Sequence, residues 1–416
     1  MSRRRVVITG MGTVNPLGNN VPEFWKNCIE GKSGVKRITA FNIPPHMSQI
    51  AGMVGPSMAQ GNSKIQERNL LFAEAAAQEA LRDAKLLDAP LVYERCGVFI
   101  ATAIAEIALM EWSFNQNRSG CGHVGFVPHK SPYFGPSFFF NNVAQTIALK
   151  HKFKGGAVTL STGCTGGNDA IGYALHTIRS GRVDVAIAGA TEAPITPLVV
   201  AAFSKIGATS KRNLEPERAS RPFDKDRDGF VLAEGCGMFV LEELSHALER
   251  GATIYAEVAG TGSVNNCYHM TDIPQDGKAI ARACKLALKD AYAEPDEVDY
   301  INAHGSSTIQ NDVAETHAFH EIFGDRAASI PVTSIKSQLG HALSAANSLE
   351  LITVVLSLRD HVIPPTINLE AQDPACLLNV VGNKALARSV NTILKTSSGF
   401  SGIHSSLILK RMEMRR

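Results

Sequence analysis

The residue best placed for nucleophilic chemistry is Cys164, where the chain is predicted to turn from a strand into a helix. It lies in the segment 155–181, GGAVTLSTGCTGGNDAIGYALHTIRSG. Residues 157–161 predict a buried strand, and the apolar residues between 170 and 178 recur at helical spacing. A thiol on the first helical turn meets free backbone N–H groups and the positive end of the helix dipole, which favour the thiolate. The same pattern also fits a small core cysteine.

Three further motifs follow Cys164 and carry residue types suited to binding an anionic intermediate. His304 lies in NAHGSST after a predicted strand, and Lys336 and His341 lie in KSQLGHA before a predicted helix. The third motif is SSGFSG at residues 397–402, whose glycines let backbone N–H groups turn inward as an oxyanion hole requires. Each motif alone also fits a structural histidine, a solvated loop or a hairpin turn.

The elements that must position these motifs alternate in type along the chain, which is typical of an α/β protein. Strands are predicted at residues 5–9, 96–100, 157–161, 183–188, 238–242, 298–303, 392–395 and 407–409. Helices are predicted at residues 70–85, 165–178, 279–292 and 344–358. The order restarts near residue 253, so we expect a duplicated layered fold with halves at 1–250 and 251–416.

Composition excludes several classes of protein. The chain has 416 residues and a formal net charge of +2, so no overall charge favours nucleic acid or an anionic membrane. Its eight cysteines form no CxxC pair and no zinc spacing with histidine, which indicates reduced thiols and no metal site. The first apolar run is too short for a signal peptide, and the tract at 349–358 is too short to span a bilayer. We therefore expect a cytoplasmic protein without nucleic acid or membrane partners.

Two other segments have a structural interpretation. Gly10 and Gly12 follow a predicted strand, but Asn15 and Pro16 occupy the place where a dinucleotide-binding fingerprint needs a small residue. These glycines are therefore expected to shape a turn. The polar stretch 212–227 holds two prolines and is expected to be a surface excursion.

The four motifs in this order resemble the active-site motifs of the β-ketoacyl synthases of the thiolase superfamily. The resemblance covers essentially the whole chain and includes RRVVITGMGTVNPLG near the start, SRPFDKDRDGFVLAEG at 220–235 and NDVAE at 311–315. STGCTGGNDAIGYA, EAPITPLVVAAF at 192–203 and YHMT at 268–271 are similar to the catalytic ketosynthase alpha subunit of bacterial type II aromatic polyketide synthases. The resemblance implies a thiolase-like, duplicated five-layer αβαβα fold.

The implied activity is that of a β-ketoacyl-[acyl carrier protein] synthase in type II polyketide biosynthesis. Such an acyltransferase condenses malonyl-carrier protein, with loss of CO₂, with an acyl chain bound to its cysteine. Cys164 would carry the acyl chain, and backbone N–H groups of Cys164 and Phe400 would form the oxyanion hole. His304 and His341, as neutral donors, would bind the malonyl thioester and stabilise the enolate.

Other residues would support these groups. Lys336 is expected to hold His341 and Glu315 in place, with Phe400 acting as a gate between the acyl and malonyl sites. The remaining expected residues are Ser306 and Thr308 for pantetheine, Gly399 and Ser401 for substrate, and Glu315 and Asp312 as supports of the catalytic residues. No cofactor is bound permanently, and phosphopantetheine is supplied by the acyl carrier protein.

The motifs depart from the family pattern at a few positions. Ser401 stands where a glycine is usual, and it is expected to restrict the loop if its φ must become positive. Ser344 and Asn347 also replace glycines and are expected to narrow or polarise the pocket. Gly167 and Asn168 replace the pair usual after the cysteine.

The expected partners are an acidic acyl carrier protein and a related chain-length factor in a heterodimer, with a homodimer as the alternative. Candidate docking charges are Lys205, Lys211, Arg212 and Arg221. The aromatic residues Phe134, Phe138, Phe139 and Phe140 are expected in the core or at the subunit interface.

Two alternative functions remain open at this point. A fatty-acid condensing enzyme that works as a homodimer is the main alternative. A non-catalytic chain-length or scaffold subunit is the second alternative, and the intact Cys164, His304 and His341 argue against it.

Overall fold

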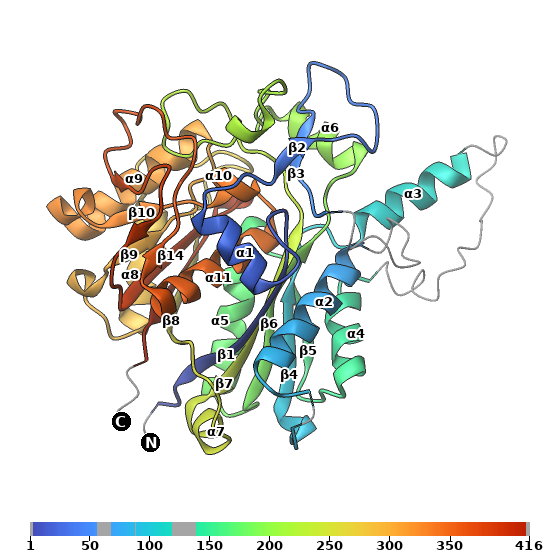
Figure 1. Cartoon of the computed structure of the whole chain (residues 1–416), viewed down its shortest axis with the longest axis vertical. Coiled ribbons are helices and arrows are strands. Elements are labelled where there is room, and N and C mark those ends of the chain that lie inside the picture. Colours follow the sequence, from blue (N-terminus) through green and yellow to red (C-terminus); the bar gives the residue numbers. More distant parts are fainter. Residues whose placement is uncertain (1–2, 56–67, 88, 119–138, 413–416) are drawn as a thin grey trace.

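The computed structural model is built from two groups of β-strands with helices between them and on both outer sides (Figure 1). It describes residues 3–55, 68–87, 89–118 and 139–412. Within these residues, eleven strands form one hydrogen-bonded sheet. Its two halves meet where Val7 and Ile8 pair with Glu257 and Ala256, a contact of two residues on each side. The halves diverge from this seam and leave room for helices between them.

The two strand groups have the same topology. The first contains β1 (Val6–Val14), β4 (Cys96–Ala101), β5 (Ala157–Leu160), β6 (Val185–Glu192) and β7 (Gly235–Glu243). The second contains β8 (Ala256–Asn265), β9 (Tyr300–Asn302), β10 (Pro331–Thr333), β14 (Thr392–Ser398) and β15 (Ile403–Lys410), with β12 (Asn379–Val380) added at its edge. Across the sheet, the strands of the first group follow the order β5-β4-β6-β7-β1 and those of the second follow β10-β9-β14-β15-β8. If the five strands of each group are renumbered 1 to 5 along the chain, both orders read 3-2-4-5-1. This repetition confirms the predicted duplicated α/β fold.

The helices complete a five-layer arrangement (Figure 1). One outer layer holds α2 (Arg68–Asp83) and α4 (Asn142–His151), the other holds α8 (Lys278–Asp290) and α9 (Ile309–Phe323), and α5 (Gly166–Arg179) and α11 (Ser344–Asp360) lie between the strand groups. The other helices are α1 (Val21–Ile29), α3 (Ile107–Arg118), α6 (Pro197–Lys205), α7 (Leu244–Glu249) and α10 (Lys336–Leu339). Two small ribbons pair β2 (Val35–Arg37) with β3 (Ile50–Gly52) and β11 (Val362–Ile363) with β13 (Leu386–Ala387).

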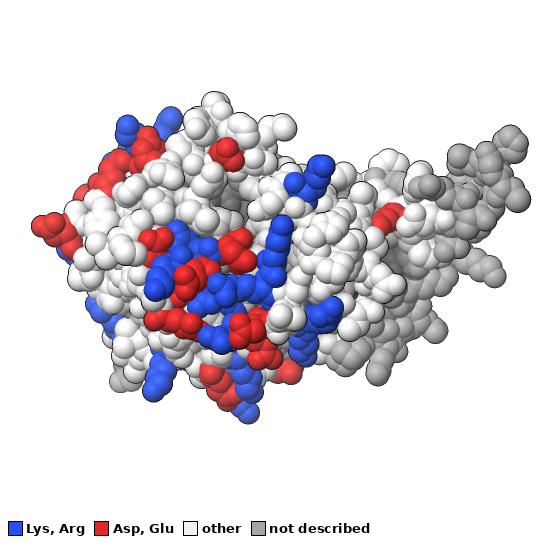
Figure 2. All heavy atoms as spheres, turned by 90° about the horizontal axis from the view of Figure 1, so that it is seen from above, with Lys and Arg blue, Asp and Glu red and all other residues white. Residues whose placement is uncertain are grey.

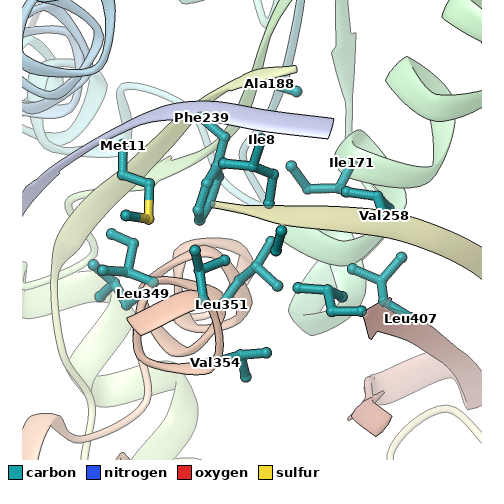
Figure 3. Packing of buried hydrophobic residues seen from close by; sticks show 14 of the residues in the cluster. Ile8, Met11, Ile171, Ala188, Phe239, Val258, Leu349, Leu351, Val354 and Leu407 are labelled. Atoms are coloured by element: carbon teal, nitrogen blue, oxygen red, sulfur yellow. The ribbon is translucent and has the colours of Figure 1, made fainter. Parts of the chain in front are cut away.

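The core is centred on α11, which is buried on every side over residues 344–358. Its side chains belong to one apolar cluster with residues of both strand groups (Figure 3). Leu349 and Leu351 lie near Met11 and Phe239 of the first group, and Leu407 of the second lies close by. A helix that is hydrophobic all round is buried all round, as its sequence predicts. The few polar residues on α11 are therefore enclosed by protein.

The elements predicted from the sequence are present, with most differences at their ends. The first strand continues to Val14 instead of residue 9, and the penultimate strand continues to Ser398 instead of residue 395. None of the helices in the described ranges is both long and apolar enough to cross a membrane. The division into domains at 1–250 and 251–416 stays a prediction, since α5 and α11 pack against both strand groups.

Two structural expectations are wrong. Gly10 and Gly12 lie inside β1 and not in a turn, and a Cβ on Gly12 would lie 2.0 Å from the carbonyl oxygen of Ala76. These glycines let α2 pack closely on the strand. The stretch 212–227 is not wholly a surface excursion, because Arg221 and Asp224 within it are buried and paired.

Candidate active site

Cys164 lies on a tight turn between β5 and α5. A 3₁₀ turn, Gly163–Thr165, leads directly into α5, and Gly163 has a φ of +59°, a conformation that glycine adopts freely. A Cβ on Gly167 would lie 2.9 Å from Ser344 O and 2.7 Å from Ser348 Oγ. The glycine therefore allows α5 to begin in direct contact with α11.

The start of α11 holds the backbone of the nucleophile turn. Ser344 Oγ donates to Gly163 O at 2.7 Å, and Asn347 Nδ2 donates to Cys164 O. Ser397 Oγ on β14 donates to the same carbonyl at 3.0 Å. Ser344 and Asn347 were expected to narrow or polarise the pocket, but they bind this backbone and do not line the cavity beside Cys164. They fix where the thiol sits.

The electrostatic setting of Cys164 differs from the sequence-based expectation. Burial raises the pKa of the thiol to about 11, although Lys336 and the backbone N–H groups of Phe400 and Cys164 act to lower it. Burial penalises the charged thiolate more than the helix start favours it. The helix start was expected to favour the thiolate, whereas the raised pKa favours the thiol.

The loop after β14 reaches over the nucleophile. The backbone N–H groups of Phe400 and of Cys164 itself face the thiol sulfur closely enough to lower its pKa. A Cβ on Gly399 would lie 3.3 Å from the Cys164 backbone nitrogen, so the loop passes close to the turn. Two N–H donors that meet at the sulfur are placed to receive the carbonyl oxygen of a thioester formed there.

The two predicted histidines lie together opposite Cys164. His304 follows β9 and His341 follows α10, and their ring centroids are 5.2 Å apart at nearly a right angle. Burial, followed by the positive charge of Lys336, holds both pKa values well below the usual range. Both rings are therefore neutral, as expected for donors from Nε2. Phe230 packs edge-on against His341 at 5.3 Å.

Glu315 on α9 fixes the loop that carries His304. Its carboxylate accepts the backbone N–H groups of His304 at 2.8 Å and Gly305 at 2.6 Å, and it also accepts Thr396 Oγ1 at 2.6 Å. Asp312, also predicted as a support, does not bond the His304 loop directly as Glu315 does. It accepts the Phe223 backbone N–H at 2.9 Å and contacts the site only through neighbouring residues.

Lys336 is placed differently from the prediction. Its ammonium donates to His304 O at 2.7 Å and pairs with Glu350, rather than holding His341 or Glu315. Glu350 also pairs with Lys395, 2.6 Å away, and all three side chains are buried. The sequence analysis missed Glu350 and Lys395. The signal was a single acidic residue in the apolar tract 349–358 and a single lysine in the apolar strand after residue 391.

Phe400 lies between two cavities. The inner one, of about 40 Å³, is lined by Cys164, both histidines, Ser306, Thr308 and Gly399 among others. The outer one, of about 460 Å³, opens past Ile206, Thr271 and Ile309. Ser306 and Thr308 hydrogen-bond each other at 2.8 Å on the path between them. Phe400 therefore stands at the passage into the inner cavity.

Ser401 lies on the outer side of the same loop. It already has a φ of +67°, a conformation that serine adopts at some cost. Its N–H donates to Met270 O at 2.7 Å, and its carbonyl accepts Asn265 Nδ2 at 2.9 Å. The loop is thus fastened to the segment after β8. In the described parts of the chain, no group of three or more His, Cys, Asp or Glu is arranged to hold a metal ion.

Comparison with known families agrees with this geometry. Residues 3–247 match the N-terminal domain of β-ketoacyl synthases, and residues 255–370 match the C-terminal domain. The chain belongs to the β-ketoacyl synthase family. It is a condensing enzyme of the acyltransferase type, as the sequence predicted.

Curated relatives of this β-ketoacyl synthase include enzymes of two pathways. The tetracenomycin polyketide synthase ketoacyl synthase alpha subunit of Streptomyces glaucescens is 42% identical over 99% of this chain and 98% of its own length. The 3-oxoacyl-[acyl-carrier-protein] synthase 2 of Coxiella burnetii is 40% identical over 99% of this chain and all of its own length.

Solved structures resemble the synthase over nearly its whole length. A type II polyketide synthase ketosynthase, bound to a hexaketide and in complex with its acyl carrier protein, is 43% identical, with a TM-score of 0.93 over 99% of this chain and all of the other. The ishigamide ketosynthase/chain length factor is 34% identical, with a TM-score of 0.90 over the same shares.

The raised pKa of Cys164 predicts how the thiol reacts with an alkylating reagent. The rate of Cys164 carboxamidomethylation by iodoacetamide should rise about tenfold per pH unit from pH 7 to pH 9, because the thiolate fraction rises that steeply below its pKa. Peptide mass spectrometry of timed samples measures this rate, with the exposed Cys267 as an internal reference for the reagent. A rate that levels off below pH 8 contradicts the assignment of a resting thiol.

Proposed function

We propose that this synthase catalyses decarboxylative Claisen condensation of malonyl-carrier protein with an acyl chain bound to Cys164, in type II polyketide biosynthesis. One observation carries the proposal. Cys164, His304 and His341 meet at a single small cavity whose entrance is occupied by Phe400. A nucleophile, two neutral donors and an oxyanion hole are the parts that this reaction needs.

The first step loads the acyl chain. Cys164 sulfur attacks the thioester carbonyl of an acyl-carrier protein, and the N–H groups of Cys164 and Phe400 stabilise the tetrahedral oxyanion. The phosphopantetheine thiolate leaves and takes up the proton that Cys164 gives up. The step consumes the Cys164 thiol and the carrier thioester and forms the Cys164 thioester and the carrier thiol, so protons balance overall.

The second step forms the carbon–carbon bond. The thioester oxygen of the malonyl group accepts hydrogen bonds from His304 and His341, which draw electron density toward it as CO₂ leaves. The resulting enolate carbon attacks the acyl carbonyl on Cys164. The oxyanion collapses, the Cys164 thiolate leaves, and the extended β-ketoacyl chain stays on the carrier protein.

The side chains that line the passage between the outer and inner cavities suit a pantetheine arm. Ser306 and Thr308 present hydroxyls on the path that leads from the outer cavity to Cys164. An arm that hydrogen-bonds there would place its thioester beside the histidines, and Phe400 would have to move to admit it. Phosphopantetheine is therefore proposed as a group brought by the carrier protein and not retained by the synthase.

The names of the relatives favour polyketide synthesis. Among the matches described above, the curated relative with the higher identity and the solved structure with the higher TM-score are both polyketide ketosynthases. Elongation of fatty acids is the alternative, since a 3-oxoacyl-[acyl-carrier-protein] synthase is nearly as similar. A non-catalytic subunit is not favoured, because the nucleophile and both histidines are present at one site.

The function predicts distinct losses for each member of the site. Intact mass spectrometry after incubation with malonyl- and acyl-carrier proteins should show acyl mass on wild-type Cys164, and none on Cys164→Ala. His304→Ala should still accept the acyl group but condense at least about a hundredfold more slowly, because a donor to the enolate is lost. Release of CO₂ is followed in parallel.

Two results would contradict the function. Wild-type synthase that neither gains acyl mass nor releases CO₂ with any carrier protein is not a condensing enzyme. A self-sufficient homodimer that accepts saturated acyl chains and extends each by one condensation to a 3-oxoacyl product would assign it to fatty-acid synthesis instead.

The carrier protein is proposed to dock at the outer cavity. Lys205 ends α6 in an exposed position beside Ile206, which lines that cavity, and Lys211 is exposed a few residues on. Arg221 is excluded from docking because it is buried against Asp224. Charges on the face seen in Figure 2 are mixed, so a few local contacts rather than one broad basic patch would steer the acidic partner.

Reversal of the Lys205 charge tests the docking site. Lys205→Glu should raise KM for malonyl-carrier protein about threefold to tenfold and leave kcat with a small malonyl thioester unchanged, because only the carrier carries the acidic surface. The matched control is Lys289→Glu at the far end of α8, near Asp290, which pairs with Arg3. Equal effects of the two substitutions on KM would remove Lys205 from the docking surface.

A chain-length-factor homologue is proposed to pair with this synthase along β5. Within the described residues β5 is one of the two edge strands of the sheet, at the opposite edge from β12, and it is only half-buried, unlike the other strands of its group. Phe139 and Phe140 are exposed just before α4, which packs on β5, while Phe134 and Phe138 lie outside the described residues. The exposed pair suits an interface and not a core. An open edge strand pairs readily with another chain.

The outward hydrogen-bonding groups of β5 test this pairing. Gly156 O accepts from Val98 N on β4 and Leu160 O accepts from Thr102 N directly after it, so the alternate residue Thr159 presents its N–H outward. Thr159→Pro should weaken association with a co-expressed partner at least about tenfold, whereas Thr159→Val, which keeps the N–H, should retain it. Size-exclusion chromatography with mass measurement follows the complex. Equal retention of partner by both variants excludes this edge, and a self-paired wild type identifies the homodimer.

A further inference from the structure

A second buried lysine lies behind the active site, in the same charged cluster as Lys336. Lys395 is on β14, and its side chain is 0% exposed. Its ammonium lies 2.6 Å from Glu350 Oε2 and donates to Thr396 O at 2.6 Å. Glu350, in turn, pairs with Lys336 through its other oxygen. One buried carboxylate therefore joins two buried ammonium groups.

The two lysines reach the two sides of the active site. Lys336 Nζ donates to the carbonyl of His304 at 2.7 Å. Lys395 Nζ lies 3.5 Å from Asn347 Oδ1, and Asn347 Nδ2 donates to the carbonyl of Cys164. An ammonium beside Oδ1 favours the amide orientation in which the NH₂ end of Asn347 meets the Cys164 carbonyl. The cluster thus ties the histidine loop to the nucleophile turn.

Each oxygen of Glu350 has its own lysine, Lys336 at Oε1 and Lys395 at Oε2. A second buried ammonium still carries a desolvation cost, and burial lowers the pKa of Lys395 to about 8 despite Glu350. Besides pairing with Glu350, this second cation reaches Asn347, which holds the nucleophile turn.

The excess positive charge acts on the histidines. After burial, the charges of Lys336 and Lys395 both lower the pKa values of His304 and His341. His341 and His404 also act on His304, and Glu315 faces Lys395 from α9. An imidazolium beside two ammonium groups is disfavoured, so the rings stay neutral.

We propose that Lys395 is a positioning residue of the condensing site, which orients Asn347 on the nucleophile turn and keeps His304 and His341 neutral. Lys395 does not line the inner cavity, so it acts through these residues and not on the substrate. The inference rests on the proposed function, which assigns the two histidines to the malonyl thioester.

The test compares pH profiles of condensation for the wild type and for Lys395→Met, which removes the charge and keeps the length of the side chain. We expect kcat to fall about tenfold with little change in KM, because the donors are disturbed while the docking surface is intact. The acid limb of kcat should move to higher pH by about one unit, since the histidines protonate more easily without the nearby cation. Lys285→Met, which removes an exposed lysine paired with Glu321, should leave the profile unchanged.

A second variant separates charge from folding. Lys395→Ala leaves space beside Glu350, and methylammonium chloride should restore at least about a third of the lost kcat, whereas tetramethylammonium chloride at equal ionic strength should not. A wild-type acid limb in Lys395→Met, equal rescue by both salts, or variants that fail to fold even with methylammonium would each overturn the positioning role. A wild type that does not condense contradicts the proposed function instead.

Discussion

The close contact between the beginnings of α5 and α11 is the constraint on which the active site depends. Ser344 and Ser348 of α11 lie so close to Gly167 that a side chain at this position would not fit, so the backbone of α5 contacts α11 directly. The contact presses the nucleophile turn of the first half against residues supplied by the second. Cys164 and the histidines come from opposite halves of the duplicated fold, and this packing makes them one site.

Burial then sets the protonation of the nucleophile and the two histidines. It raises the pKa of the Cys164 thiol and lowers the pKa values of the histidines, so the resting centre is largely neutral. Neutral donors suit a reaction whose negative charge appears only in its transition states and intermediates. In a dry site, donors already aimed at that charge need little rearrangement as it develops. The positive charges of Lys336 and Lys395 behind the histidines also lower their pKa values and favour the neutral rings.

Sequence could predict the parts of the site but not their mutual support. The order of motifs located Cys164, His304, His341 and the Phe400 loop, because each follows a recognisable strand end or precedes a helix. The apolar tract at 349–358 predicted a buried helix, and the restart of elements near residue 253 predicted the duplication that the strand orders confirm. These are local patterns, which a single chain displays directly.

The errors arise where distant segments meet. Lys336 was assigned to His341 and Glu315, whereas its partner is Glu350, fourteen positions further on, on a helix that runs between the sheets. The helix start at Cys164 favoured a thiolate, but that prediction overlooked how deeply the turn is buried. The burial is set by α11 and β14, and the sequence does not show that these elements lie beside the turn. Gly10 and Gly12 were assigned to a turn for the same reason, since the helix that packs on them begins over fifty residues later.

The inner cavity adds a constraint on how the enzyme must work. A space of about 40 Å³ beside Cys164 holds only a few atoms, whereas an acyl chain that grows by two carbons per cycle needs much more. Phe203, Phe230 and Leu343 close its walls, and Phe400 closes its entrance. Loading of the chain therefore requires the Phe400 loop or these walls to move. Ser401, held at a positive φ by contacts to Met270 and Asn265, is the point at which that movement must release hydrogen bonds.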